Sequence, residues 1–175
     1  MRKTSSLLLA VLAAACSPDQ DGTTMDASQL TAPLFEVRGD HFRTHATGSE
    51  EVPANSSLAQ GQAMFQLSDD GTTLSYKLIV ANIENVTQSH IHLPAPAGVN
   101  AGIVVWLYPS APPLQLIPGR SQGVLAEGEI TSANFVGALA GMSMDDLLGH
   151  LRSGNAYVNV HTTQLPPGEI RGQVR

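Results

Sequence analysis

After about Phe35, apolar and polar side chains alternate along one segment after another, and this two-residue period limits the fold more than any other feature. Successive side chains of a β-strand point to opposite faces, so the alternation is typical of strands with one buried face. Residues 62–67 and 74–80 alternate around the turn Asp69-Asp70-Gly71, which predicts a hairpin. Further strands, separated by Gly/Pro-rich turns, are expected at 89–93, 103–108, 123–130, 156–162 and 169–174. The pattern predicts an all-β Greek-key sandwich or barrel of about 7–9 short antiparallel strands.

One segment departs from this period and predicts a short helix near residues 143–153. Ser143 can cap its start with Asp146 three residues on, and Gly154 suits its end. An apolar stripe then lies on one face of the helix, formed by Met144, Leu147, Leu148 and Leu151. We expect this helix to cover an open end of the sheets.

The first fifteen residues have the parts of an export signal. Arg2 and Lys3 form a basic start, residues 7–12 are apolar, and residues 13–15 are three alanines. The apolar run is too short to cross about 30 Å of hydrocarbon, so a permanent membrane helix is not expected. Residues 1–15 are therefore predicted to be a signal peptide that is removed.

Small residues that run directly into Cys16 resemble the lipobox of bacterial lipoproteins, in which the cysteine is acylated and becomes the first residue. Cys16 is the single cysteine of the chain and cannot form an internal disulfide. The resemblance implies a lipid on Cys16 and an address in the cell envelope, at the outer membrane or cell surface. The alternative is cleavage near Ala15, which would leave a periplasmic or secreted protein with a free thiol.

The region behind the cysteine is polar and predicts a flexible tether over residues 16–34, followed by one folded domain over residues 35–175. Removal of the signal takes away two basic residues and no acid, so the formal net charge falls from -6 to -8. The chain contains no run of Lys and Arg that could neutralise phosphates. We therefore expect no nucleic-acid partner, and contact with a membrane only through the lipid anchor.

Five ordered segments resemble the CHRD domain, the module first defined in chordin. They are Gly48-Ser49-Glu50-Glu51-Val52-Pro53-Ala54, Asp70-Gly71-Thr72-Thr73-Leu74-Ser75-Tyr76, Ser89-His90-Ile91-His92-Leu93-Pro94-Ala95-Pro96, Tyr157-Val158-Asn159-Val160-His161-Thr162 and Gly168-Glu169-Ile170-Arg171-Gly172-Gln173. The resemblance covers residues 45–175. It implies a secreted or surface-anchored all-β domain, found alone in many bacterial envelope proteins, with no established reaction.

The histidines carry the chemistry that can be read from the residues. His90 and His92 lie two residues apart on an expected strand, so both side chains point to one face. His161 lies on another expected strand and shares its face with Tyr157 and Asn159, while the two valines between these residues face the opposite way.

If the two strands are neighbours, three imidazoles converge. Three nitrogen ligands suit zinc or copper. Glu169 could be a fourth ligand, or an acceptor that fixes the tautomer of a histidine.

A strand with His-x-His before a Gly/Pro-rich loop is also similar to the copper-binding strand of copper-zinc superoxide dismutases, which are Greek-key β proteins. Only His90, His92 and His161 have counterparts there, with Arg171 as a candidate for the arginine that guides the anion. The further metal ligands and the disulfide of that family have no counterpart, so dismutase activity is not expected. The alternative role of the three rings is structural, with each paired to a backbone carbonyl, a tyrosine or Glu169.

Other candidates are assigned simpler roles. His41, His45 and His150 are expected at the surface, and Trp106, which lies in an apolar run, is expected in the core. Glu50 and Glu51 are adjacent and would point to opposite faces of a strand, so they cannot serve as a carboxylate pair.

Two functions follow from these observations. The first is a lipid-anchored CHRD-domain protein acting as a non-catalytic binding or structural module of the envelope, whose partner is an envelope protein, a surface polymer or a metal ion. The alternative is a copper- or zinc-binding envelope protein that uses His90, His92 and His161. An enzyme ranks last, because no nucleophile with a base and no acid-base pair is identified by spacing.

Overall fold

The computed structural model describes residues 40–175, so the expected signal peptide (1–15), tether (16–34) and lipidated Cys16 lie outside the described residues. The strands in this part are β1 (His41–Thr47), β2 (Gln60–Leu67), β3 (Leu74–His92), β4 (Ile103–Tyr108), β5 (Ile117–Ile130), β6 (Tyr157–Thr162) and β7 (Ile170–Gln173). One α-helix, α1 (Met144–Arg152), joins them, with short 3-10 turns at Gly48–Glu50, Ser132–Asn134 and Gly137–Leu139. The expected all-β class with one short helix is confirmed.

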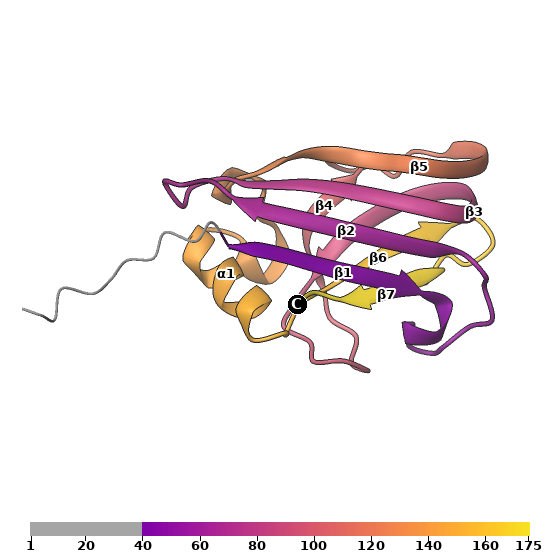
Figure 1. Cartoon of the computed structure of the whole chain (residues 1–175), viewed down its shortest axis with the longest axis horizontal. Helices are drawn as coiled ribbons and strands as arrows, with labels where there is room; N and C mark the ends of the chain where they lie inside the picture. The colour runs from indigo at the N-terminus through magenta and orange to yellow at the C-terminus, as the bar shows by residue number, and fades with distance from the viewer. Residues whose placement is uncertain (1–39) are drawn as a thin grey trace, which may run out of the picture. The chain divides into compact units, whose positions relative to one another are not determined.

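The strands form one sheet that closes on itself into a flattened barrel. The order of pairing is β2-β1-β7-β6-β3-β4, and β3 also pairs with β2 and β5. In Figure 1, β1, β2, the first part of β3 and β5 lie side by side in the layer turned to the viewer, with β4, β6 and β7 behind. The expected β2–β3 hairpin is confirmed, with Leu67 opposite Leu74 across the turn.

Strand β3 belongs to both layers of the barrel. Its first part pairs with β2 and β5, and its last part, from Val86 to His92, pairs with β6. Between these parts Asn82 and Asn85 have φ values of 56° and 54°, and the register with β5 shifts beside them. Asparagine tolerates this left-handed backbone better than most residues, so these two positions can bend the strand without breaking it.

The hydrophobic core lies between the two layers and is closed at one end by α1. Ala63, Phe65, Leu78, Ile91 and Val158 face it from both sides and are buried. The apolar stripe of α1, formed by Met144, Leu147, Leu148 and Leu151, is buried as well. In Figure 1, α1 lies at the end of the barrel where β1 begins, which agrees with its expected role as a cover.

The structure differs from the expected strands in three places. The alternation predicts separate strands at 74–80 and 89–93, but both belong to the single strand β3, because the backbone stays paired through the bend at Asn82 and Asn85. Strand β5 begins at Ile117, earlier than the expected 123. Strand β1 was not expected at all, and it places His41 and His45 on its exposed face.

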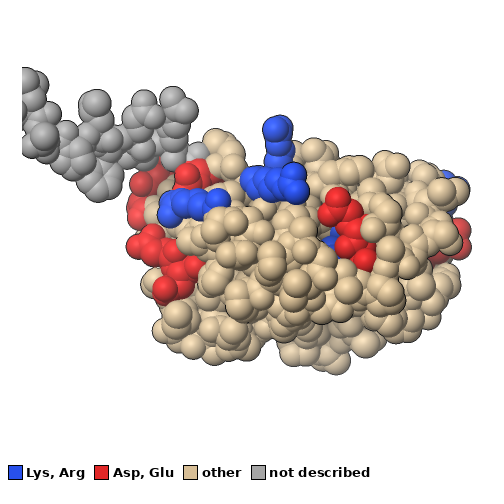
Figure 2. Space-filling view, turned by 90° about the horizontal axis from the view of Figure 1, so that it is seen from below, with Lys and Arg blue, Asp and Glu red and all other residues tan. Residues whose placement is uncertain are grey.

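The outer surface carries scattered charges. On the face in Figure 2, small groups of Lys and Arg lie near Asp and Glu, among a larger uncharged area. Between Asp40 and the C-terminus, no helix has the length and apolar character needed to cross a bilayer.

The start of α1 gives a first test of how sequence sets local structure. The Ser143 side chain accepts from the Asp146 backbone N–H, and the Asp146 carboxylate accepts from the Ser143 N–H at 2.8 Å. Ser143→Ala removes half of this capping box, so we expect the free energy of unfolding to fall by about 1 kcal/mol in urea denaturation. The exposed Ser110 supplies the control, since Ser110→Ala should change it by less than about 0.5 kcal/mol. Equal effects of the two variants would contradict the capping role.

Candidate functional site

The candidate site is a layer of polar side chains on the face of β6 that points away from the hydrophobic core. Val158 and Val160 of β6 face the core, while Tyr157, Asn159 and His161 face the opposite way, as the alternation predicts. Pairing places His90 opposite Asn159, and Asn159 opposite Arg171. We call the set of His90, His92, Tyr157, Asn159, His161 and Arg171 the polar layer. All six side chains are buried, although they lie on the outer face of a sheet.

The structure brings together the three histidines that the sequence singles out. One imidazole nitrogen of each of His90, His92 and His161 lies within 4.8 Å of those of the other two. The ring centroid of His90 is 5.5 Å from that of His92 and 5.1 Å from that of His161. The ring centroids of His92 and His161 are 6.5 Å apart. A zinc–nitrogen bond is about 2.0–2.1 Å long, so shifts of about 1 Å in the rings would be needed for all three to reach one ion.

Backbone carbonyls fix which nitrogen of two of these rings carries the proton. His92 Nδ1 lies 3.0 Å from the carbonyl oxygen of Ala101, and His161 Nδ1 lies 2.8 Å from that of Pro166. A carbonyl oxygen only accepts, so each Nδ1–H donates and each neutral ring presents a lone pair at Nε2. This is also the arrangement that orients histidines bound to metals.

The side-chain amide of Asn159 lies between these two lone pairs. Its Oδ1 is 2.9 Å from Nε2 of His92 and 3.0 Å from Nε2 of His161, and the NH₂ group takes this position when the amide is turned by 180°. Two nitrogens that carry lone pairs need a donor, and an amide meets this need when its NH₂ group is turned toward them. Asn159 therefore occupies the position from which both lone pairs converge, and it separates His92 from His161.

His90 differs from its two neighbours because neither of its nitrogens has a hydrogen-bond partner. It is fully buried, and it carries two of the five buried side-chain polar atoms without a partner in the part of the chain from Asp40 onward. Burial, together with the His161 and His92 rings when they are charged, lowers the pKa of His90 to about 3. Its ring lies edge-on to Trp106, with centroids 4.3 Å apart. A neutral imidazole is thus buried with neither nitrogen bonded to another protein group.

The other two histidines are also held neutral. Burial lowers the pKa of His92 to about 4, against the opposing hydrogen bond to Ala101. Burial lowers the pKa of His161, against the hydrogen bond to Pro166. At neutral pH all three rings are therefore free of the extra proton that a metal ion would have to displace.

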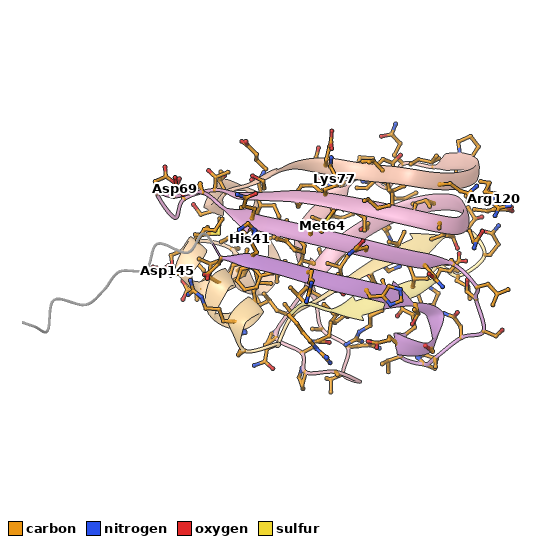
Figure 3. All side chains as sticks on the ribbon, viewed as in Figure 1. His41, Met64, Asp69, Lys77, Arg120 and Asp145 are labelled. Atoms are coloured by element: carbon orange, nitrogen blue, oxygen red, sulfur yellow. The ribbon has the colours of Figure 1, made fainter. Side chains whose placement is uncertain are left out.

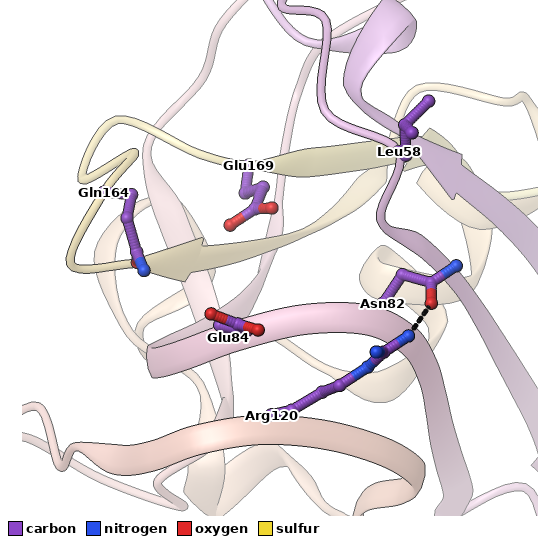
Figure 4. Close-up of a pocket in the computed structure, with 6 residues that line it drawn as sticks. All are labelled: Leu58, Asn82, Glu84, Arg120, Gln164 and Glu169. Atoms are coloured by element: carbon purple, nitrogen blue, oxygen red, sulfur yellow. Dashed lines mark hydrogen bonds between the residues drawn. The ribbon is translucent and has the colours of Figure 1, made fainter.

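Glu169 is not brought to the histidines, although the register of β6 and β7 places it close to His161. Its carboxylate accepts a hydrogen bond from the Thr162 hydroxyl at 2.7 Å and another from the Ser57 hydroxyl at 2.7 Å. It lines a surface pocket with Leu58, Asn82, Glu84, Arg120 and Gln164, shown in Figure 4. The structure thus gives Glu169 hydroxyl partners in place of the expected metal or imidazole.

A loop over residues 94–102, here called the strap, covers the polar layer. The Arg171 guanidinium donates to the carbonyl of Val99 at 2.7 Å and to the side-chain oxygen of Asn100 at 3.0 Å. Its Cζ atom lies 3.4 Å from the centroid of the Tyr157 ring. Tyr157 in turn stacks on His92, with ring centroids 4.7 Å apart and planes 3° from parallel. Arg171 therefore links the strap to a stack that ends at one of the histidines, and it is not exposed to guide an anion.

A buried carboxylate, Glu51, lies next to this arrangement. The side chain is 7% exposed, and its Oε1 has no hydrogen-bond partner. Burial raises the pKa of Glu51 to about 7, although the Arg171 charge and the Val52 N–H lower it. Gly168, with φ 144°, packs so closely against the carboxylate that a Cβ atom there would collide with it. The sequence gives no sign that Glu51 is buried beside Arg171, because its neighbours in the fold come from distant segments.

The remaining side chains show which contacts sequence reasoning missed. The sequence predicts Trp106 in the core, but it is half-buried and contacts His90. The reason is that β4 pairs with β3 so that Trp106 lies opposite His90. Asn159 and Tyr157 were placed on the correct face, but their contacts with two rings were not foreseen. His41 projects outward from the front layer near Met64 in Figure 3, His45 is exposed, and His150 is half-buried on α1.

Glu51 gives a prediction with a defined sign. Its folded-state pKa of about 7 lies above the ordinary 4.5, so its contribution to stability is full below pH 4.5 and is lost as the pH rises through 7. Glu51→Gln imitates the protonated form, so the variant should match the natural chain at pH 4.5 and exceed its free energy of unfolding at pH 8. The gain should be at most a few kcal/mol, since one pKa unit corresponds to about 1.4 kcal/mol.

Urea unfolding from pH 4.5 to 8 measures this difference, with the exposed Glu129→Gln as the control that should leave the pH profile unchanged. A natural chain that is more stable than Glu51→Gln at pH 8 would mean that attraction to Arg171 outweighs the cost of burying the carboxylate.

Comparison with known proteins bears on the whole domain. The family model of the CHRD domain matches residues 42–174. This range includes the whole polar layer and all seven described strands except His41, the first residue of β1. No curated protein and no solved structure matches the chain. The resemblance stated from the five segments is confirmed, and the chain belongs to the CHRD domain family.

Proposed function

We propose that this protein is a metal-binding CHRD module of the cell envelope, in which His90, His92 and His161 together hold one copper or zinc ion. Family membership supports a binding or structural module and indicates no catalytic role. The observation that carries the metal proposal is His90, whose two buried nitrogens lack partners beside two imidazoles with oriented lone pairs.

A purely structural role explains two of the rings but not the third. His92 and His161 each satisfy Nδ1 with a backbone carbonyl, as a structural histidine would. An unpaired buried polar group costs roughly 1–3 kcal/mol, and an apolar side chain of similar size would avoid that cost at position 90. A metal ion would accept a lone pair from His90 together with the Nε2 lone pairs of His92 and His161, which now contact Asn159. Metal binding would therefore explain why position 90 is an imidazole.

The proposed place of action is the outer membrane or cell surface, where the acylated Cys16 would anchor the chain and residues 16–34 would act as a tether. The support is the order of basic, apolar and small residues directly before a single cysteine. A protein anchored there is exposed to envelope proteins, to surface polymers and to metal ions that have not yet entered the cytoplasm.

The metal proposal predicts binding that depends on His90. We expect one copper or zinc ion per chain, detected by a change in the fluorescence of Trp106, the single tryptophan, whose ring centroid is 4.3 Å from that of His90. His90→Leu should weaken binding by at least about 100-fold, because one of three ligands is lost. In the absence of metal the same variant should be as stable as the natural chain or more so, since it removes two unpaired nitrogens.

His41→Ala is the matched control, because His41 is exposed on β1 and lies outside the group of three rings. It should leave metal binding unchanged. Binding no tighter than about millimolar in the natural chain would remove the proposal. So would binding that persists in His90→Leu, since the ion would then be held elsewhere.

The anchor makes a separate prediction. Labelling with a radioactive fatty acid in a bacterial host should mark the natural chain and fail in Cys16→Ser, because the acyl group attaches to the thiol. Ser17→Ala is the control and should keep the label. Label on Cys16→Ser would contradict lipidation at this position and leave the secreted alternative.

A further inference from the structure

The ligands of the proposed metal site are all uncharged. The Nδ1–H groups of His92 and His161 donate to backbone carbonyls, where many metal sites place a carboxylate that adds negative charge. The remaining group within reach of both Nε2 atoms is the amide of Asn159, which is also neutral. An ion bound here would therefore keep its full charge.

The nearby carboxylates do not compensate for this. Glu169 is held by the hydroxyls of Thr162 and Ser57, and the Glu51 charge acts on Arg171. Within residues 40–175, no acidic group contributes to the pKa of any of the three histidines. The charge that does act on them from outside the group is positive, since the Arg171 guanidinium disfavours positive charge on His92.

The site is also buried, which makes the charge of the ion decisive. His90 is fully buried, and His92 and His161 are 6% and 7% exposed. The free energy needed to move an ion from water into a low-dielectric interior grows with the square of its charge, so a divalent ion costs about four times as much as a monovalent ion of the same size. Neutral ligands and a neighbouring guanidinium leave this cost largely unopposed for a divalent ion.

We infer that this site takes a monovalent soft cation, Cu(I), in preference to Zn(II) or Cu(II). The inference rests on the proposed function, because it names the ion that the same three histidines would hold. Imidazole nitrogen is a suitable ligand for copper, and three neutral rings suffice for a singly charged ion. Zinc in proteins takes four ligands and gains from anionic ones, and the fourth group in this site is the neutral Asn159 amide.

The test compares ions that differ in charge, using the full chain with Cys16→Ser so that no thiol competes for copper. Cu(I) affinity is measured under anaerobic conditions against a chromophoric Cu(I) chelator, and Zn(II) affinity against a zinc chelator at the same pH. Ag(I) serves as a monovalent probe that needs no reductant, and Trp106 fluorescence reports occupancy for each ion. We expect one Cu(I) per chain, bound at least about 100-fold more tightly than Zn(II).

Asn159→Asp tests the cause, because it replaces the amide by a carboxylate of nearly the same shape beside both Nε2 atoms. The ratio of the Zn(II) to the Cu(I) dissociation constant should fall by at least about tenfold in this variant. Gln62→Glu, which adds the same charge on the exposed face of β2, should leave the ratio unchanged. Melting curves of both variants check that they fold.

The outcomes separate the two proposals. If Zn(II) binds the natural chain as tightly as Cu(I), and His90→Leu abolishes both, the metal site stands and the preference for a monovalent ion is wrong. The preference is also wrong if Cu(I) and Ag(I) bind but the ratio does not respond to Asn159→Asp. If no ion binds, the proposed function itself fails.

Discussion

The geometry of this domain depends on the ability of strand β3 to change layers without losing its hydrogen bonds. Its first part pairs with β2 and β5, and its last part pairs with β6 and β4. The change occurs at Asn82 and Asn85, which adopt a left-handed backbone that most side chains disfavour. Because β3 ends at His92, the direction of the strand after this bend decides where two of the three clustered histidines lie.

The polar layer shows how a sheet can bury both of its faces for different reasons. The inner face of β6 is covered by the hydrophobic core, and its outer face is covered by the strap and by the side chains of neighbouring strands. Polar groups in such a position must find partners, and most do so with backbone carbonyls of the loops. Glu51 and His90 are exceptions in and beside the polar layer, and both are informative because the surrounding structure tolerates their cost.

Sequence periodicity was sufficient for the class of fold and for the faces of the strands that carry the site. Alternation in residues 157–162 placed Val158 and Val160 inside and His161 outside, and the helix cap at Ser143 was read from local chemistry alone. The meeting of His161 with His90 and His92 was only conditional, because which strands pair is a long-range property that no local pattern encodes. The resemblance to the CHRD family added the order of the segments but not their contacts.

Other features were missed because they depend on competition between partners. Glu169 lies next to His161 in the register, yet two hydroxyls, from Thr162 and Ser57, hold its carboxylate, and Ser57 is 112 residues away. The pattern predicts separate strands at 74–80 and 89–93 where the structure has one bent strand, since asparagine with a left-handed backbone occurs in turns as well as in bulges. Sequence spacing shows which groups can meet, but not which of several acceptors a donor will choose.

The strap connects these points to the chemistry of the site. Its backbone carbonyl at Ala101 sets the tautomer of His92, and its carbonyl at Val99 binds the cation of Arg171. The same short loop thus orients a lone pair toward the centre of the cluster and holds a positive charge near it. A carboxylate in place of the Ala101 carbonyl would orient the His92 ring equally well and would also attract a divalent ion. The use of backbone carbonyls separates orientation from charge, and in the proposed metal site this separation would let three histidines distinguish ions by charge.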